Sequence, residues 1–257
     1  MAIAYHSKTE IEGIRRAGRV VMDVLDVLRD NVRPGVTTGE LDAIARRELD
    51  RRGAVSNFLG YRPAKGIPPF PGVICASVND VIVHGIPGSR TLVEGDIIAI
   101  DMGAIVDGWH GDSAITVPVG RIAPEAQRLL GVTQEALRRG IAAARPGNHV
   151  LDIATAVQAY VEQQGFSVVR QYAGHGIGRA LHEDPWVPNY VEPGTPNPKL
   201  RPGMTFCVEP MVNAGRAATH EWPDHWTVTT KDGSLSAHFE HTIAVTQDAP
   251  EILTGAA

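Results

Sequence analysis

Two acidic residues lie on opposite arms of a segment with the pattern of a β-hairpin. The segment is IIAIDMGAIVDGWHGDSAITV, and Asp107-Gly108 at its centre is typical of a two-residue turn. Pairing about this turn makes Asp101 and Asp112 diagonal neighbours on one face, with backbones roughly 7–8 Å apart. Their carboxylates can then reach one point, and if they are buried there they need a cation, a proton or water. An exposed hairpin face would accommodate the same two acids.

The second half of the chain adds three residues of the same chemical kind. Glu209 lies in MTFCVEPMV, Glu240 lies in AHFEHTIAV, and His175 stands between two glycines in YAGHGIGRALHEDP. Each of these residues alone is more often structural than functional. Together, four carboxylates and one imidazole form an oxygen-rich donor set that suits manganese, iron, cobalt or zinc. The number of carboxylates also permits bridging between two ions.

Helical segments precede these acidic strands. Apolar residues recur at three- and four-residue steps over residues 10–31, which predicts a helix with one buried face. Thr38 is the expected N-cap of a second helix, GELDAIARRELDRR, and Gly53 is its expected stop. The sequence therefore predicts a helical hairpin at the start of the chain.

The same pattern of two helical segments around an Arg-Pro-Gly recurs later in the chain. The helical patterns PEAQRLLGVTQEALRRGIAAA and DIATAVQAYVEQQ flank a second Arg-Pro-Gly. Gly35 recurs as Gly147 and Gly53 recurs as Gly165, a shift of 112 positions in both cases. We expect one domain over residues 1–257 with two similar halves, about 10–120 and about 121–250.

Four β-like stretches follow the helix pairs. They cover residues 72–86 and 96–119 in the first half and 203–215 and 236–246 in the second. Apolar and polar residues alternate in them, and the turn signals Asp107-Gly108 and Asp232-Gly233 favour antiparallel hairpins. The predicted class is α+β.

Composition excludes several classes of function. The net charge is −5 and Lys and Arg are scattered among acids, so no basic stripe indicates a nucleic-acid partner. The N-terminal sequence lacks the apolar region of a secretory signal, and no stretch approaches the roughly 20 apolar residues of a membrane helix. Two cysteines are too few for a disulfide scaffold, which fits a reducing compartment. We expect a cytoplasmic protein without membrane contact.

Five phrases of the chain resemble a known enzyme family. NDVIVHGIP, AIDMGAIVDGWHGDSA, GHGIGRALHEDP, CVEPMV and SAHFEHT are similar, in order and spacing, to those of type I methionine aminopeptidases. All five metal-binding positions of that family hold the expected residue here, namely Asp101, Asp112, His175, Glu209 and Glu240. The resemblance implies the pseudo-two-fold "pita-bread" α+β fold, in which an antiparallel sheet is covered by two helix pairs and metals lie between the halves. It also implies removal of the initiator methionine from nascent proteins, with preference for a small second residue.

The resemblance also implies a division of roles. Asp112 and Glu240 would bridge two divalent ions, Asp101 would complete the shell of one ion, and His175 with Glu209 that of the other. A hydroxide activated by the two ions would attack the scissile bond, with Glu209 as proton shuttle. The implied catalytic residues are His84, His182 and Glu209, the two histidines also contacting the substrate.

Residues matching the methionine pocket of similar enzymes complete the expected site. They are Tyr61, Phe70, Cys75 and Trp226, although core aromatic residues would produce the same pattern. The chain departs from the usual pattern in the long RPAKGIPP stretch after Tyr61 and in Leu181, where many bacterial members have an aromatic residue. Three histidines receive no role: His110, His238 and His241.

Two alternatives remain on the same sequence. Proline dipeptidases and aminopeptidases P share the five ligands but carry an extra N-terminal domain, and non-catalytic binding relatives have lost ligands.

The absence of a large insertion between His175 and Glu209 favours type I over type II, and the start at the first helix favours the short bacterial form. The expected partners are the ribosome and nascent polypeptide N-termini that begin with Met. The enzyme is expected to act as a monomer. The native metal stays open among Mn, Fe, Co and Zn.

Overall fold

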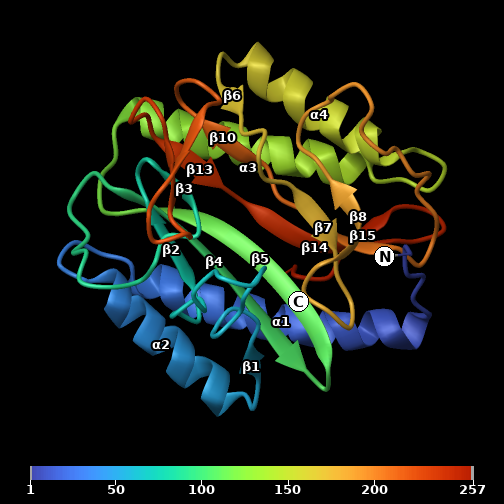
Figure 1. Ribbon diagram of the computed structural model, residues 1–257, viewed down its shortest axis with the longest axis horizontal. Coiled ribbons are helices and arrows are strands. Elements are labelled where there is room, and N and C mark those ends of the chain that lie inside the picture. Colours follow the sequence, from blue (N-terminus) through green and yellow to red (C-terminus); the bar gives the residue numbers. More distant parts are fainter. Residues whose placement is uncertain (1, 256–257) are drawn as a thin grey trace.

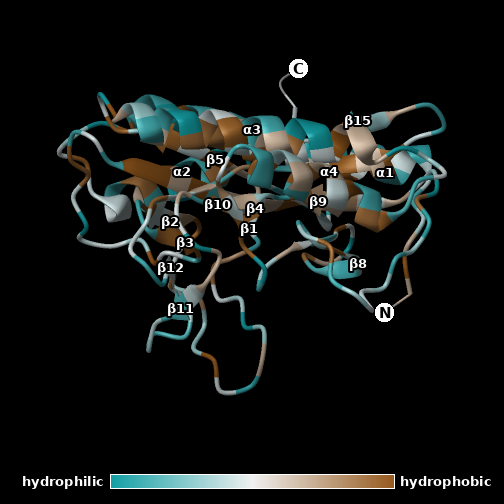
Figure 2. Ribbon diagram, turned by 90° about the horizontal axis from the view of Figure 1, so that it is seen from above, coloured by the Kyte–Doolittle hydropathy of each residue, from teal (hydrophilic) through white to brown (hydrophobic). Residues whose placement is uncertain are grey.

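Four helices cover one face of a curved β-sheet in the computed structural model, which describes residues 2–255. The helices are α1 (Lys8–Asn31), α2 (Thr38–Arg51), α3 (Pro124–Ala143) and α4 (Val150–Gln163). The blue pair α1 and α2 lies along one half of the sheet, and the pair α3 and α4 along the other (Figure 1). Seen from above, all four helices form one layer, and the smaller strands and long loops lie on the opposite side (Figure 2). No helix of residues 2–255 has the length and apolar character to cross a membrane.

The large sheet has nine strands in the order β1-β4-β5-β14-β9-β7-β8, with β2 added on β4 and β15 on β14. Each registered pair in it is antiparallel. This confirms the predicted α+β class. Its strands are β1 (Val55–Ser56), β2 (Cys75–Val78), β4 (Ile97–Val106), β5 (Trp109–Pro118), β7 (Gly174–Gly176), β8 (Glu183–Val187), β9 (Thr205–Val208), β14 (Glu240–Val245) and β15 (Pro250–Ile252).

Two three-stranded sheets flank the large one. One has the order β13-β10-β6 and the other β11-β12-β3. Their strands are β3 (Val81–Val83), β6 (Ser167–Val168), β10 (Met211–Asn213), β11 (Thr219–Glu221), β12 (Val228–Thr230) and β13 (Ser236–His238).

Capping boxes fix the starts of the first two helices. Ser7 accepts the backbone N–H of Glu10 and the Glu10 carboxylate returns to the Ser7 N–H, which satisfies two otherwise unpaired donors. In α2 the cap is Thr37, paired in the same way with Glu40, and the expectation of Thr38 was wrong by one position. The reason is the spacing to Glu40, since a capping box needs the acid three residues after the cap.

The repeat seen in the sequence has a structural counterpart. Gly35 and Gly147 adopt φ of +92° and +94° after the first helix of each pair, a left-handed conformation that favours glycine. Gly53 and Gly165 end the second helices with φ of +63° and +78°. Equivalent short strands, β1 and β6, follow each pair.

The two turn signals had different outcomes. Asp107 and Gly108 both have positive φ and join β4 to β5, with Gly103 opposite Asp112 as the turn predicts. Asp232-Gly233 does not close a hairpin, because β12 and β13 belong to different sheets. The Asp232 carboxylate instead accepts the backbone N–H of Arg216, so the turn is held to a neighbouring loop.

Candidate metal centre and substrate pocket

The structure brings the five predicted metal-binding residues to one point on the face of the large sheet away from the helices. Asp101 comes from β4, Asp112 from β5, His175 from β7 and Glu240 from β14, and Glu209 directly follows β9. Strand pairing explains the convergence, because Ala114 on β5 is opposite Asp101 on one side and Glu240 on the other. Asp112 lies two residues from Ala114 on β5. The pairing therefore puts Asp101, Asp112 and Glu240 on three neighbouring strands.

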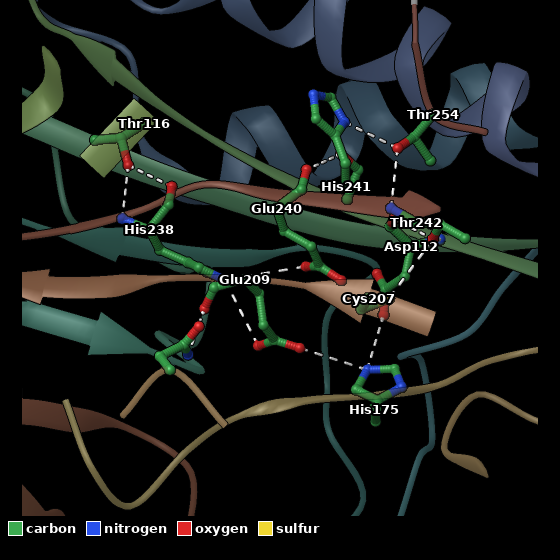
Figure 3. Close-up of polar contacts among 12 residues, drawn as sticks. Asp112, Thr116, His175, Cys207, Glu209, His238, Glu240, His241, Thr242 and Thr254 are labelled. Atoms are coloured by element: carbon green, nitrogen blue, oxygen red, sulfur yellow. Dashed lines mark hydrogen bonds and ion pairs between the residues drawn. The ribbon is translucent and has the colours of Figure 1, made fainter. Parts of the chain in front are cut away.

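The donor atoms lie too far apart for hydrogen bonds and close enough to share an ion. His175 Nε2 is 3.7 Å from Glu209 Oε1 and 3.9 Å from Asp112 Oδ2. Figure 3 shows these side chains converging, with Glu240 beside them. A ligand atom from each of Asp112, His175 and Glu240 lies within 4.8 Å of the others.

Burial makes this group of acids unstable as free carboxylates. It raises the pKa of Asp101 to about 7. Burial also raises the pKa of Asp112 well above its usual value, and the charges of Glu240 and Asp101 raise it further. The pKa of Glu209 is raised by burial and by the charges of Asp101 and Asp112. A compensating positive charge is therefore required for all of them to ionise near neutral pH.

Several oxygens of the cluster also lack hydrogen-bond partners. Asp101 Oδ1, Asp112 Oδ1 and Glu240 Oε1 are buried without one. Buried carboxylate oxygens rarely stay unpaired, and metal coordination is one of the few ways to satisfy them. Burial also lowers the pKa of His175 to about 3, which keeps its imidazole neutral and able to bind a cation. The residues present thus fit divalent metal ions.

Glycines let the strands approach closely around His175. A side chain at Gly174 would collide with the backbone of Cys207 on β9, and one at Gly176 would collide with the backbone of Asp184. The two glycines noted in the sequence therefore serve strand packing, which places the imidazole against the acids.

The thiols near the cluster are poor nucleophiles. Burial raises the pKa of Cys75 well above its usual value, and the charge of Asp101 adds to the effect. Burial and the charge of Glu240 do the same for Cys207. Both cysteines stay protonated and apolar in character, so nucleophilic cysteine chemistry is disfavoured.

Two histidines line the cavity together with the metal-binding cluster. His84 follows β3 with φ of +59°, a conformation uncommon for residues other than glycine and often found at functional sites. Its ring packs against Tyr172 and Trp226, and burial lowers its pKa to about 4. The His182 ring lies 4.3 Å from the His175 ring, and its Nδ1 is 2.7 Å from the Tyr61 hydroxyl.

An apolar cavity of about 260 Å³ adjoins the cluster. Tyr61, Phe70, Cys75 and Trp226 line it together with His84, His182 and the five donors. Phe70 and Trp226 stack edge-to-face at 5.1 Å, and the Trp226 indole N–H donates to Pro68 O at 3.1 Å. The RPAKGIPP stretch thus reaches the cavity through Pro63 and is held to the cavity wall through Pro68.

The sequence interpretation missed other residues that line the cavity. Phe58 and Tyr172 contribute aromatic surface, and the buried imidazole of His238 faces the acids. Phe58 and Tyr172 had no signal beyond being aromatic residues near a recognised phrase. His241, in contrast, points to Thr254 Oγ1 at 2.9 Å and lies outside the cavity lining.

The curled antiparallel sheet, its helix pairs and the carboxylate-rich centre define a metallopeptidase of the pita-bread fold. The model of metallopeptidase family M24 matches residues 12–247. The chain is 50% identical over 256 residues to the methionine aminopeptidase of Aquifex aeolicus, covering 99% of both chains. Its structure is similar to that of the methionine aminopeptidase from Rickettsia prowazekii, with a TM-score of 0.94 and 43% identity, covering 99% of this chain and 100% of that one. The chain belongs to metallopeptidase family M24, in its methionine aminopeptidase group.

The fold is shared more widely than the sequence. The prolidase from Pyrococcus furiosus has a TM-score of 0.79 at 20% identity, and the match covers 98% of this chain and 66% of that one. A likeness at this identity concerns the fold alone.

Proposed function

We propose that this protein removes the N-terminal methionine from nascent polypeptides and peptides, with preference for a small second residue. The observation that carries the proposal is the apolar cavity ending directly at the five-residue donor cluster. A long, flexible thioether side chain suits a cavity walled by Phe70, Trp226 and Cys75, because sulfur contacts aromatic rings favourably. The metal centre would then stand at the first peptide bond of a bound chain.

Two divalent metal ions, from Mn, Fe, Co or Zn, fit the donor set. We infer that Asp112 and Glu240 would help to hold both ions, that Asp101 would hold one, and that His175 and Glu209 would hold the other. When bound, such ions supply a hydroxide nucleophile near neutral pH and polarise the scissile carbonyl.

The remaining chemistry falls to side chains around the cavity. Glu209 carries the proton from the nucleophile to the leaving amine, since its carboxylate borders both the donor cluster and the cavity. His84 and His182 donate hydrogen bonds to the peptide and to the charge that develops on its oxygen. Both imidazoles line the cavity together with the donor cluster, which supports this role.

A panel of peptides and metals tests the function. Met-Ala-Ser should be cleaved after its methionine, and an Xaa-Pro dipeptide should not. Chelation should abolish cleavage, and added divalent metal should restore it. Cleavage of Xaa-Pro alone would favour the prolidase-like alternative, and no cleavage with any metal would favour a binding protein.

We further propose that residues 1–257 form one catalytic domain of two similar halves, which works as a cytoplasmic monomer beside the ribosome. The equivalent helix pairs, α1 with α2 and α3 with α4, support the division into two similar halves. A nascent polypeptide as substrate supports a location beside the ribosome in the cytoplasm. Sedimentation of the purified protein, alone and with ribosomes, tests the oligomeric state and the ribosome contact.

A further inference from the structure

His238 occupies a fixed position beside the metal-binding cluster. It ends β13 and is opposite Met211 on β10. Its backbone N–H donates to Thr116 Oγ1 at 3.0 Å, and the Thr116 hydroxyl donates to the His238 carbonyl at 2.7 Å. The residue is 2% exposed. The backbone is therefore clamped to β5, and the imidazole has little freedom to leave the site.

The imidazole of His238 points at two of the acids without bonding to either. Its Nε2 lies 3.7 Å from Glu209 Oε2 and 4.0 Å from Glu240 Oε2 (Figure 3). This nitrogen is buried and has no hydrogen-bond partner. It shares that property with Asp101 Oδ1 and Asp112 Oδ1, which belong to the metal-binding cluster. Buried polar atoms are normally paired, so a nitrogen in this position is expected to bind a cation or to make a hydrogen bond.

The distances around His238 resemble those around His175. His175 Nε2 is 3.7 Å from Glu209 Oε1, and His238 Nε2 is 3.7 Å from the other oxygen of the same carboxylate. Two donors that bind one ion at about 2.0–2.2 Å each, at ordinary coordination angles, stand roughly 3–4 Å apart. Ligand atoms of Glu209, His238 and Glu240 also lie within 4.8 Å of one another. The two imidazoles therefore approach Glu209 from its two sides in the same manner.

We propose that His238 is a further metal ligand of this centre and binds, through Nε2, the ion that Glu209 and Glu240 hold. The inference rests on the metal centre of the proposed function and goes beyond the five donors assigned there. It gives the centre two nitrogen donors in place of one. A second imidazole favours iron, cobalt or zinc over manganese, because affinity for nitrogen donors rises along that series.

Counting coordinated nitrogens tests the proposal without peptide. The full-length protein is prepared metal-free, loaded with one equivalent of Mn²⁺, and studied by pulsed EPR with unlabelled and ¹⁵N-labelled histidine. We expect two coordinated imidazole nitrogens in the wild-type protein and one in the His238→Gln variant. Calorimetric titration with Co²⁺ should show at least about tenfold weaker binding in the variant, since losing even an outer partner of a ligand costs about 10–100-fold.

His241→Gln is the matched control. His241 is a half-buried histidine on the adjoining strand β14, and its ring is bound to Thr254 away from the acids. This variant should keep two coordinated nitrogens and unchanged Co²⁺ affinity.

Three outcomes would overturn the proposal. They are a single coordinated nitrogen in the unchanged protein, two nitrogens in His238→Gln, and unchanged Co²⁺ affinity in that variant. The first outcome is measured without any substitution, so it stands even if His238→Gln fails to fold. A protein with one coordinated nitrogen that still cleaves Met-Ala-Ser would leave the proposed function intact and remove only the role of His238.

Discussion

The hydroxyl of Tyr61 lies 2.7 Å from Nδ1 of His182, and their rings are 5.4 Å apart. Burial raises the pKa of Tyr61, so its hydroxyl stays protonated and can donate to Nδ1. The neutral imidazole then carries its proton on Nε2, the nitrogen free to donate to a substrate. Tyr61, expected from the sequence only as a pocket wall, thus also orients His182.

Tyr61→Phe keeps the ring that lines the cavity and removes this hydrogen bond. We expect kcat for Met-Ala-Ser to fall about fivefold, the equivalent of about 1 kcal/mol for one hydrogen bond, with KM little changed. Steady-state kinetics on metal-loaded protein measures both values. Tyr190→Phe is the control, because the Tyr190 hydroxyl bonds Glu192 away from the cavity. Equal losses in both variants would mean that Tyr61 does not act through His182.

His182→Ala and His84→Ala should separate catalysis from metal binding. Both histidines lie at the cavity, and neither is among the proposed ligands. We expect turnover to drop by the equivalent of about 2.7–4 kcal/mol, the usual effect of deleting one donor to a developing oxyanion. Metal analysis of the purified variants should show nearly full occupancy. If one variant lost its metals, that histidine would belong among the ligands.

The pKa of His84 predicts a pH effect on stability. Burial lowers this pKa to about 4, so the folded state resists a proton that the unfolded chain takes up below about pH 6.5. The contribution of His84 to the unfolding free energy is therefore present above pH 6.5 and is lost as the pH falls toward 4. As the pH falls from about 6.5 to about 4, metal-free His84→Gln should become more stable relative to the metal-free wild-type protein. Urea unfolding of both proteins at several pH values measures the difference, and a constant difference would contradict the assigned burial effect.

Local signals predicted the parts of the structure that local forces determine. The Asp107-Gly108 turn fixes the register of β4 and β5, so the pairing that joins Asp101 to Asp112 followed from sequence. Asp232-Gly233 carries the same kind of signal, yet the strands on either side pair elsewhere. A turn restricts the chain near it, whereas packing over the whole molecule selects the partner of a short strand.

His238 illustrates the same limit at the site. In SAHFEHT, strand alternation puts His238 on the same face as Glu240 and His241 on the other, but it does not show whether the His238 imidazole reaches the metal-binding acids. The clamp of its backbone by Thr116, far away in sequence, and the pairing of β13 with β10 decide the direction. The resemblance located the five donors because those positions share recognisable phrases, and it gave no guide to His238.

The last prediction concerns Leu181, which is 6% exposed and packs with Phe58, Phe70, Cys75 and Trp226 in the cavity wall. It directly precedes His182, where the methionine side chain and the second residue of a substrate would meet. Leu181→Phe adds volume at this point, so a branched second residue should have less room than alanine. Such steric differences are worth about 1–3 kcal/mol in discrimination. We expect kcat/KM for Met-Val-Ser to fall roughly tenfold more than that for Met-Ala-Ser, with metal content unchanged.

Leu181→Met is the matched control, since it conserves volume and should keep the ratio between the two peptides near that of the unchanged protein. Because Leu181 lies in the apolar cluster and outside the proposed ligand set, both variants should bind metal normally. The measurement is kcat/KM for Met-Ala-Ser, Met-Thr-Ser and Met-Val-Ser in the three proteins under one metal. If Leu181→Phe left the ratio unchanged, Leu181 would not contact the second residue. Selectivity would then depend on the stretch before Phe70, which is tied to the cavity wall by the Trp226 N–H bond to Pro68.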